Sequence, residues 1–173
     1  MTDVVAPTVT LRAFDPADGA ETAAVVAAAV SGARPREVMP PDDAPHPDDW
    51  TLARERAYAR FLRARPAEES SYLVVEGTAV VGVARLRHDP AGVETGVWLA
   101  RPARGRGIGT VVLGLLVERA AAAGAARLVA DTTPDNVAAV ASLRRHGADL
   151  REQAGTVAAV VDLGAVRARG SSR

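Results

Sequence analysis

The most constraining feature of this sequence is a run of glycines at every second position, 105, 107 and 109. It separates a strand-like stretch at 93–100 from the apolar helical stretch that follows it. Alternate glycines permit positive φ angles, which turn successive backbone N–H groups toward one point. A helix that starts there adds its own unpaired N–H groups and the positive end of its dipole. The pattern therefore predicts a strand, a phosphate-binding loop and a helix in succession.

Composition narrows the chemistry of that loop. The chain has 173 residues and no Lys or Cys. A nucleotide phosphate loop of the Walker type needs Lys, so the absence of Lys excludes it. Arg104 and Arg106 are the side chains that can add charge-assisted hydrogen bonds to phosphate. The absence of Cys excludes a thiol nucleophile, a disulfide framework and a thiolate zinc site. The scattered histidines have no metal-ligand spacing, so we expect no metal site.

The remaining global properties concern location and partners. A formal net charge of +0 argues against nucleic-acid binding, which needs a basic surface. No stretch approaches the roughly 18 to 20 consecutive apolar residues of a membrane span. The first residues lack the basic segment followed by an apolar segment that is typical of a signal peptide. We therefore expect a cytoplasmic protein with no membrane partner, as a monomer or homodimer.

Hydrophobic periodicity and turn residues divide the chain into alternating helices and strands. We expect two segments that lack regular structure, a Pro-rich acidic loop at 33–49 and a tail at 165–173. Helices are predicted at 15–30, 50–65, 110–123 and 134–147, and strands at 8–14, 71–76, 79–88, 93–100, 127–131, 148–153 and 156–163. This order predicts one α/β domain with a mixed, mainly antiparallel sheet.

Two other interpretations of the glycine loop stay open at this point. It can be a flexible Gly/Arg loop of a protein with biased composition. It can also be a dinucleotide fingerprint, although Thr110 stands where G-x-G-x-x-G requires glycine. Asp131, at the end of the next predicted strand, suits a ribose-binding acid.

The residues around the loop resemble a known family. Arg104-Gly-Arg-Gly107-Ile-Gly109 fits the R/Q-x-x-G-x-G/A signature of the GCN5-related N-acetyltransferases (GNAT). The preceding segment, 94–100, looks like the branch that acetylates protein N-termini and related amines. Pro134-Asp-Asn136, followed by Gly147, resembles the second signature of the family. The single Ile and the single Asn of the chain, Ile108 and Asn136, lie inside these two signatures.

The resemblance implies a GNAT-like fold. It has a six- to seven-stranded sheet flanked by about four helices, and its fourth and fifth strands splay apart to admit acetyl-CoA. The resemblance covers residues 8–163, which we expect to form a single acyl-CoA N-acyltransferase domain, with tails at 1–7 and 164–173. The implied reaction is acetyl transfer to a primary amine, on a small molecule or a protein N-terminus, by direct attack in a ternary complex.

The resemblance also implies roles for residues. The backbone of Trp98, Leu99 and Ala100 would bind pantetheine, and an N–H near Val97 or Trp98 would stabilise the oxyanion. Asn136 would contact the cofactor; a helix cap is the alternative. The residues expected to bind the pyrophosphate are Arg104, Gly105, Arg106, Gly107, Ile108, Gly109 and Thr110.

Two residues are candidates for proton transfer. Glu94 matches the place of a general base and shares a strand face with Gly96 and Trp98, where an apolar neighbour would make it a better proton acceptor. A solvent-facing Glu at a strand end is the alternative. The usual acid of the family is a Tyr, but the matching position holds Leu143. Water or Ser142 would then protonate the departing thiolate, unless Ser142 is only a polar helix residue or a cofactor contact.

Leu143 keeps a second functional class open, a non-catalytic domain that senses acyl-CoA or binds a partner. The acceptor is less constrained. Acidic residues at 42–49 suggest a cationic amine or a peptide N-terminus, although a solvated loop explains these charges as well.

Overall fold

The computed structural model describes residues 8–40, 42, 46–90 and 92–170; the expected N-terminal tail at 1–7 and residues 171–173 lie outside this part. The elements along the chain are β1 (Val9–Ala13), α1 (Gly19–Gly32), α2 (Pro35–Val38), α3 (Leu52–Arg63), β2 (Glu69–Glu76), β3 (Ala79–Asp89), β4 (Gly92–Leu99), a 3₁₀ turn (Arg101–Ala103), α4 (Ile108–Ala122), β5 (Arg127–Thr132), α5 (Val137–Arg145), β6 (Asp149–Gln153), β7 (Thr156–Asp162) and α6 (Leu163–Gly170).

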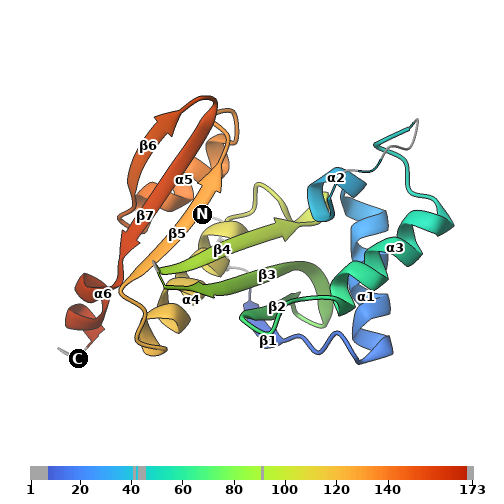
Figure 1. Cartoon of the computed structure of the whole chain (residues 1–173), viewed down its shortest axis with the longest axis horizontal. Coiled ribbons are helices and arrows are strands. Elements are labelled where there is room, and N and C mark those ends of the chain that lie inside the picture. Colours follow the sequence, from blue (N-terminus) through green and yellow to red (C-terminus); the bar gives the residue numbers. More distant parts are fainter. Residues whose placement is uncertain (1–7, 41, 43–45, 91, 171–173) are drawn as a thin grey trace, which may run out of the picture.

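The strands form one seven-stranded sheet in the order β1-β2-β3-β4-β5-β7-β6 (Figure 1). The β4–β5 pair is parallel and the other neighbouring pairs are antiparallel, so the predicted mixed, mainly antiparallel sheet is confirmed. A dinucleotide-binding fold needs a doubly wound, mostly parallel sheet. That interpretation of the glycine loop is therefore wrong.

The centre of the sheet contains the expected splay. β4 pairs with β3 along its whole length, from Gly92 to Leu99. With β5 it pairs only at Val93↔Leu128 and Glu94↔Val129. Beyond Glu94 the two strands part, which leaves the second half of β4 without a partner on that edge in the described part of the chain.

Helices cover both faces of the sheet, and side chains alternate between these faces along each strand. On one face, Ile108 and Leu116 of α4 and Leu143 of α5 pack with Leu86 and Leu128 of the sheet. On the other face, Val25 of α1 and Tyr58 of α3 pack with Leu73 and Val83, next to Trp98. The residues of β4 thus divide between two separate environments.

Besides shifts of a few residues at the ends of elements, such as α1 starting at Gly19 and not at 15, the structure differs from the predicted elements in three places. A short helix, α2, interrupts the loop expected at 33–49. The helix predicted from residue 134 starts at Val137, and its cap is Asn136, whose Oδ1 accepts a hydrogen bond from Ala139 N–H at 3.2 Å. The segment expected as a C-terminal tail is helical through Gly170, because Leu163 is fully buried and Val166 packs against the core. No helix among the described residues is long and apolar enough to cross a membrane.

Candidate active site

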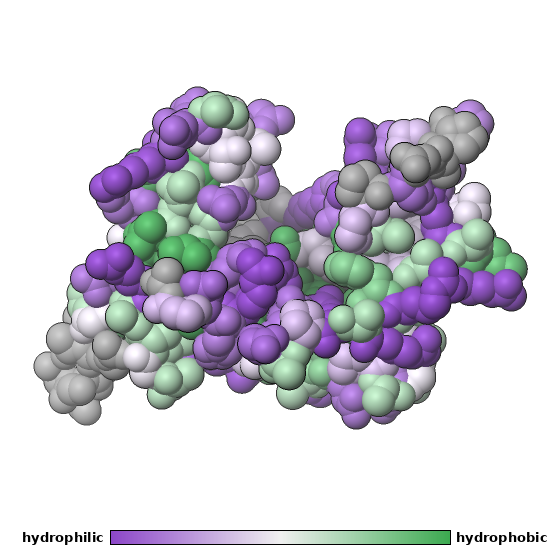
Figure 2. All heavy atoms as spheres, in the orientation of Figure 1, coloured by the Kyte–Doolittle hydropathy of each residue, from purple (hydrophilic) through white to green (hydrophobic). Residues whose placement is uncertain are grey.

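A cleft opens where β4 leaves β5. Figure 2 shows the surface hollowed between the lobe of β5, β6 and β7 and the lobe that carries α2. Ala100 N–H, directly after β4, donates to Val81 C=O of β3 at 2.8 Å. Successive residues of a strand point their backbone polar groups to opposite edges. Val97 and Leu99 therefore direct theirs toward the cleft, while Trp98 and Ala100 direct theirs toward β3.

This register changes the expected contacts with pantetheine. Ala100 C=O also has a partner, since it accepts from Ala103 N–H at 2.9 Å. Of the predicted strand residues, Leu99 lies with its backbone on the open edge, where its C=O accepts from Arg104 Nε, and Val97 joins it there. The Val97 side chain is 41% exposed, whereas Trp98 packs with the cluster on the opposite face.

The glycine loop adopts the expected conformation at two of its three glycines. Gly105 has φ +72° and Gly107, the N-cap of α4, has φ +80°. A Cβ at either position would have no neighbour within 4 Å, so conformation rather than space requires glycine there. Gly109 lies inside the helix. Among the described residues, no hydrogen-bond acceptor faces the N–H groups of residues 105–109.

The remaining loop residues have structural partners. Ile108 is fully buried in the core, so only its backbone can face a ligand. Thr110 N–H donates to Gly107 C=O at 3.1 Å, and Thr110 C=O lies 2.9 Å from His146 Nε2. A neutral carbonyl accepts, so Nε2 of His146 carries the proton. This contact joins α5 to the first turn of α4.

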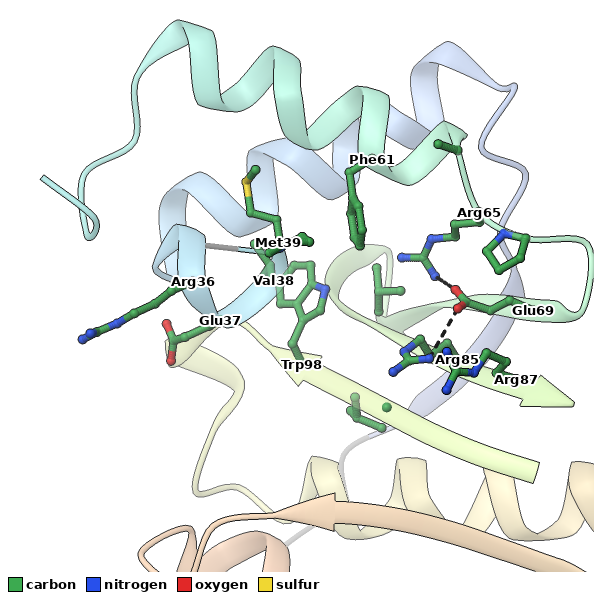
Figure 3. A pocket seen from close by; sticks show the side chains of 16 residues that line it. Arg36, Glu37, Val38, Met39, Phe61, Arg65, Glu69, Arg85, Arg87 and Trp98 are labelled. Carbon is green, nitrogen blue, oxygen red and sulfur yellow. Dashed lines mark hydrogen bonds and ion pairs between the residues drawn. The ribbon is translucent and has the colours of Figure 1, made fainter. Parts of the chain in front are cut away.

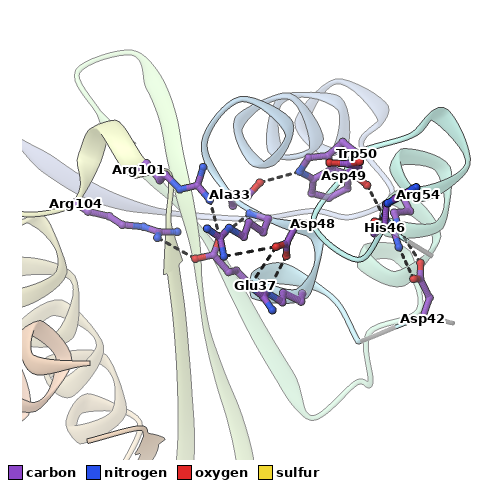
Figure 4. A network of polar contacts seen from close by, with 12 residues as sticks. Ala33, Glu37, Asp42, His46, Asp48, Asp49, Trp50, Arg54, Arg101 and Arg104 are labelled. Atoms are coloured by element: carbon purple, nitrogen blue, oxygen red, sulfur yellow. Dashed lines mark hydrogen bonds and ion pairs between the residues drawn. The ribbon is translucent and has the colours of Figure 1, made fainter. Parts of the chain in front are cut away.

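Both arginines predicted to bind phosphate are held by carboxylates. Arg104 Nε donates to Leu99 C=O at 2.8 Å and its Nη1 to Glu37 Oε1 at 3.0 Å (Figure 4). Arg106 makes two hydrogen bonds to Glu76, at 2.9 and 2.5 Å. Their side chains are 40% and 50% exposed, so both remain within reach of a ligand that shares or displaces these partners.

Glu37 is the junction between α2 and the glycine loop. Its carboxylate accepts from Arg34 N–H at 2.6 Å and from Arg104, and lies 3.8 Å from Arg101 Nη2. Burial by itself would raise the pKa of Glu37. The hydrogen bonds from Arg34 and Arg104 and the charges of Arg104 and Arg101 outweigh that effect, so the pKa lies below its ordinary value.

A cavity of about 540 Å³ lies on the face of the sheet that α3 and α2 flank, and we call it the acceptor cavity. Its floor includes Gly96, Val97 and Trp98, the stretch of β4 that also borders the cleft. Figure 3 shows Val38, Met39, Phe61 and Trp98 on one side and charged residues around Glu69 at the other end. The complete lining is Arg36, Glu37, Val38, Met39, Pro40, Phe61, Ala64, Arg65, Pro66, Glu69, Val83, Arg85, Arg87, Gly96, Val97 and Trp98.

The charged end is a chain of ion pairs that we call the arginine cluster: Arg65, Glu69, Arg85, Glu94 and Arg87. Arg65 Nη1 lies 2.6 Å from Glu69 Oε1, and Glu69 Oε2 lies 3.4 Å from Arg85 Nη1. Arg85 Nη2 lies 2.9 Å from Glu94 Oε1, and Glu94 Oε2 also accepts from Arg87. The apolar neighbour expected for Glu94 is thus replaced by two guanidinium groups, so that part of the argument for a general base does not hold.

Sequence reasoning missed this cluster because it scored strands for apolar alternation. The signal lies in the polar positions that alternate with the apolar ones. Cross-strand register places four of these residues on one face of β2, β3 and β4: Glu69, Arg85, Arg87 and Glu94. Pairing partners are not visible before the register is known. An arginine-rich composition also made each single Arg uninformative.

The candidate acid lies on α5 next to the expected Leu. The Ser142 side chain is buried, and its Oγ has no hydrogen-bond partner in the described part of the protein. Leu143 is 5% exposed and packs in the core. Its hydrocarbon side chain has no proton to donate. Asn136 acts as the helix cap; whether it also touches a cofactor stays a prediction.

Two acids of the predicted acidic loop, Asp42 and Asp48, are paired with arginines of the protein, and residues 43–45 lie outside the described part of the chain. The buried Arg54 donates to Asp42 at 2.9 and 2.6 Å and to the backbone carbonyls of His46 and Asp49 (Figure 4). Asp48 lies 2.9 Å from Arg36. No group of three or more metal-ligating side chains occurs among the described residues.

Comparison with known proteins gives matches at the level of family and fold. Residues 36–148 match the model of the Acetyltransferase (GNAT) family. A search of curated proteins found no match. The structure resembles RimL, a ribosomal L7/L12 alpha-N-protein acetyltransferase solved in complex with coenzyme A. The TM-score is 0.66 and the identity 20%, over 92% of this chain and 97% of that one.

Two further solved structures are similar. Campylobacter jejuni N-acetyltransferase PseH, in complex with acetyl coenzyme A, aligns with TM-score 0.64 and 14% identity, over 89% of this chain and 98% of that one. The ribosomal-protein-S18-alanine N-acetyltransferase from Escherichia coli aligns with TM-score 0.63 and 12% identity, over 90% of this chain and 94% of that one.

Proposed function

Because the chain belongs to the acetyltransferase (GNAT) family, we propose that it transfers an acetyl group from acetyl-CoA to a primary amine. The observation that carries the proposal is a juxtaposition. β4 loses its β5 partner after Glu94, and the same strand leads into a loop at the start of α4 whose N–H groups at 105–109 have no acceptor among the described residues. One site therefore offers a strand edge for an extended chain and a helix N-terminus for phosphate.

In this proposal the pyrophosphate binds the N–H groups of 105–109, and the pantetheine lies along the open edge of β4 at Val97 and Leu99. Arg104 and Arg106 add charge once they share or exchange their carboxylate partners. The acceptor amine enters through the acceptor cavity. This cavity reaches β4 at Gly96, Val97 and Trp98 from the face of the sheet that α2 and α3 flank.

The reaction is direct acyl transfer. The amine nitrogen forms a bond to the thioester carbonyl carbon, the C–S bond breaks, the nitrogen loses a proton and the thiolate gains one. Since the Val97 backbone faces the cleft, its N–H is our candidate oxyanion donor. Where a side chain provides such a donor, its removal raises the activation free energy by about 2.7 to 4 kcal/mol. The absence of Cys agrees with a reaction that has no thioester on the enzyme.

The reaction needs two proton transfers, one from the amine and one to the thiolate, and we propose a group for each. Glu94 is the candidate general base, acting from within the arginine cluster. Ser142 or water is the candidate donor to the thiolate, whose reference pKa of about 8.5 makes it a tolerable leaving group near neutral pH. The buried Leu143 also supports a second candidate function, an acyl-CoA sensor that binds the same ligand without turnover.

Thermal denaturation with CoA, acetyl-CoA and NAD(P) tests the proposal. A ligand at a hundredfold its Kd stabilises by about 2.7 kcal/mol. For a domain of this size that corresponds to a rise in Tm of about 5 to 10 °C. We expect this rise with both CoA forms and not with NAD(P). No shift with either CoA form would refute the proposal, and a shift without amine-dependent thiol release would favour the sensor.

A further inference from the structure

Building on the proposed acetyl transfer, we infer that the amine acceptor also carries an anionic group, such as a carboxylate, which Arg85 and Arg87 of the acceptor cavity bind. The acceptor is thus an amino-acid-like amine with an apolar body, and neither a polyamine nor a simple alkylamine. The inference depends on charge, position and cavity shape.

The first argument is charge. Within the arginine cluster, three guanidinium groups share two carboxylates, those of Glu69 and Glu94. The cluster is therefore cationic by one charge and lines a partly enclosed cavity. A charge in such a place is stabilised by an opposite charge on the ligand far more than it would be in bulk water.

The second argument is how Arg85 is held. The Arg65 side chain, 12% exposed, pairs with Glu69, which is itself 8% exposed. Glu69 and Glu94 then fix Arg85 from two sides. Arg85 and Arg87 stay 33% and 48% exposed, so their remaining donors can still reach a ligand. The planar donors of Arg match a carboxylate in two-point geometry.

The third argument is distance from the reacting centre. A Cβ on Gly96 would lie only 2.7 Å from Arg85 Nε and 3.3 Å from Arg85 Cζ, so the guanidinium lies directly on the backbone of β4. Val97 and Trp98 are the next two residues of β4, at about 3.3 Å per residue along the strand, so Arg85 lies beside the stretch that borders the cleft. With the acetyl group at Val97, as proposed above, the anion and the attacking nitrogen of one acceptor occupy neighbouring positions along β4.

The rest of the cavity agrees with this acceptor class. Val38, Met39, Phe61 and Trp98 form an apolar wall opposite the arginine cluster (Figure 3). A polyamine would need carboxylates, but those of the described residues beside the cavity are already paired: Glu69 and Glu94 within the cluster, and Glu37 with Arg104.

The test compares L-phenylalanine with its methyl ester and with 2-phenylethylamine, which lack the carboxylate and bracket the basicity of its amino group. Acetyl-CoA turnover is followed by thiol release, and the protein adds no background because it has no Cys. We expect kcat/KM to be at least about 10-fold higher for phenylalanine than for either analogue, from a charge-assisted hydrogen bond. Leucine, β-alanine and spermidine complete the panel.

Arg85→Gln is expected to reduce this preference by about 10-fold or more. The readout is the ratio of the kcat/KM values for phenylalanine and 2-phenylethylamine, since loss of the ion pair between Arg85 and Glu94 affects both acceptors. Arg151→Gln is the matched control, since Arg151 lies on β6 with an 85% exposed side chain. Equal preference in the wild type, or a preference unchanged in Arg85→Gln, would overturn the inference.

Failure of the inference is separable from failure of the proposed function. If acetyl-CoA raises Tm and spermidine or 2-phenylethylamine is the better acceptor, the function stands and the anionic acceptor is wrong. If acetyl-CoA binds, but calorimetry shows no binding of any carboxylated amine in the panel to the CoA-loaded protein, the inference is again overturned. If neither CoA form binds, the proposed function itself fails.

Discussion

Gly107→Ala gives the sharpest test of the phosphate site, because the chain contains a matched control. Gly107 and Gly155 both have φ +80°, and a Cβ at either would meet nothing within 4 Å. An L-residue in the left-handed region costs about 1 to 2 kcal/mol. Both substitutions should therefore lower Tm by a similar amount, about 2 to 8 °C for a domain of this size.

Only one of the two glycines belongs to the site. Gly107 is the N-cap of α4, whereas Gly155 lies in the turn between β6 and β7. The same strain favours loop conformations that leave positive φ at 107, and these turn the N–H groups of 105–109 away from a common point. We expect acetyl-CoA affinity to fall at least about 10-fold in Gly107→Ala, which corresponds to about 1.4 kcal/mol, and to stay unchanged in Gly155→Ala.

Calorimetric titration of acetyl-CoA into the two variants measures this difference below their unfolding temperatures. Equal affinity in both variants, with equal loss of Tm, would show that the loop conformation does not bind phosphate. The reasoning from unpaired N–H groups at the start of α4 would then be refuted.

Three other substitutions test the remaining assignments. Glu94→Gln should lower the rate by about 10² to 10⁴ fold at neutral pH if Glu94 is the general base, and an unchanged pH–rate profile removes it from the mechanism. Ser142→Ala should lower kcat by about 10² fold, the lower end for general acid catalysis. It should not lower Tm, since it deletes a buried hydroxyl that has no partner among the described residues. Intact turnover excludes the acid role. Because the pKa of Glu37 is lowered in the folded state, its stabilising effect is present above its unfolded pKa and is lost as the pH falls through its folded pKa. Urea unfolding of Glu37→Gln should therefore show a smaller loss of stability on acidification than the wild type, and parallel curves would contradict the assigned ion pairs with Arg104 and Arg101.

The sequence was most informative where structure is locally determined. The positive φ angles at Gly105 and Gly107 and the start of α4 directly after them follow from residues adjacent in the chain. Local backbone preference and capping act over a few residues, so they are visible in a single sequence. The splay of β4 and β5 also matched the expectation that came with the family resemblance.

Side-chain partners were decided only by the tertiary structure. Arg104 meets Glu37 across 67 residues of sequence, and Arg106 meets Glu76 across 30. Arg85 reaches Glu94 because antiparallel register puts Arg85 opposite Gly96, the residue with no side chain to block it. An apolar surrounding for Glu94 was reasonable from local sequence. It is replaced by two guanidinium groups once the strands are paired, because electrostatic environment depends on neighbours in space and not on neighbours in the chain.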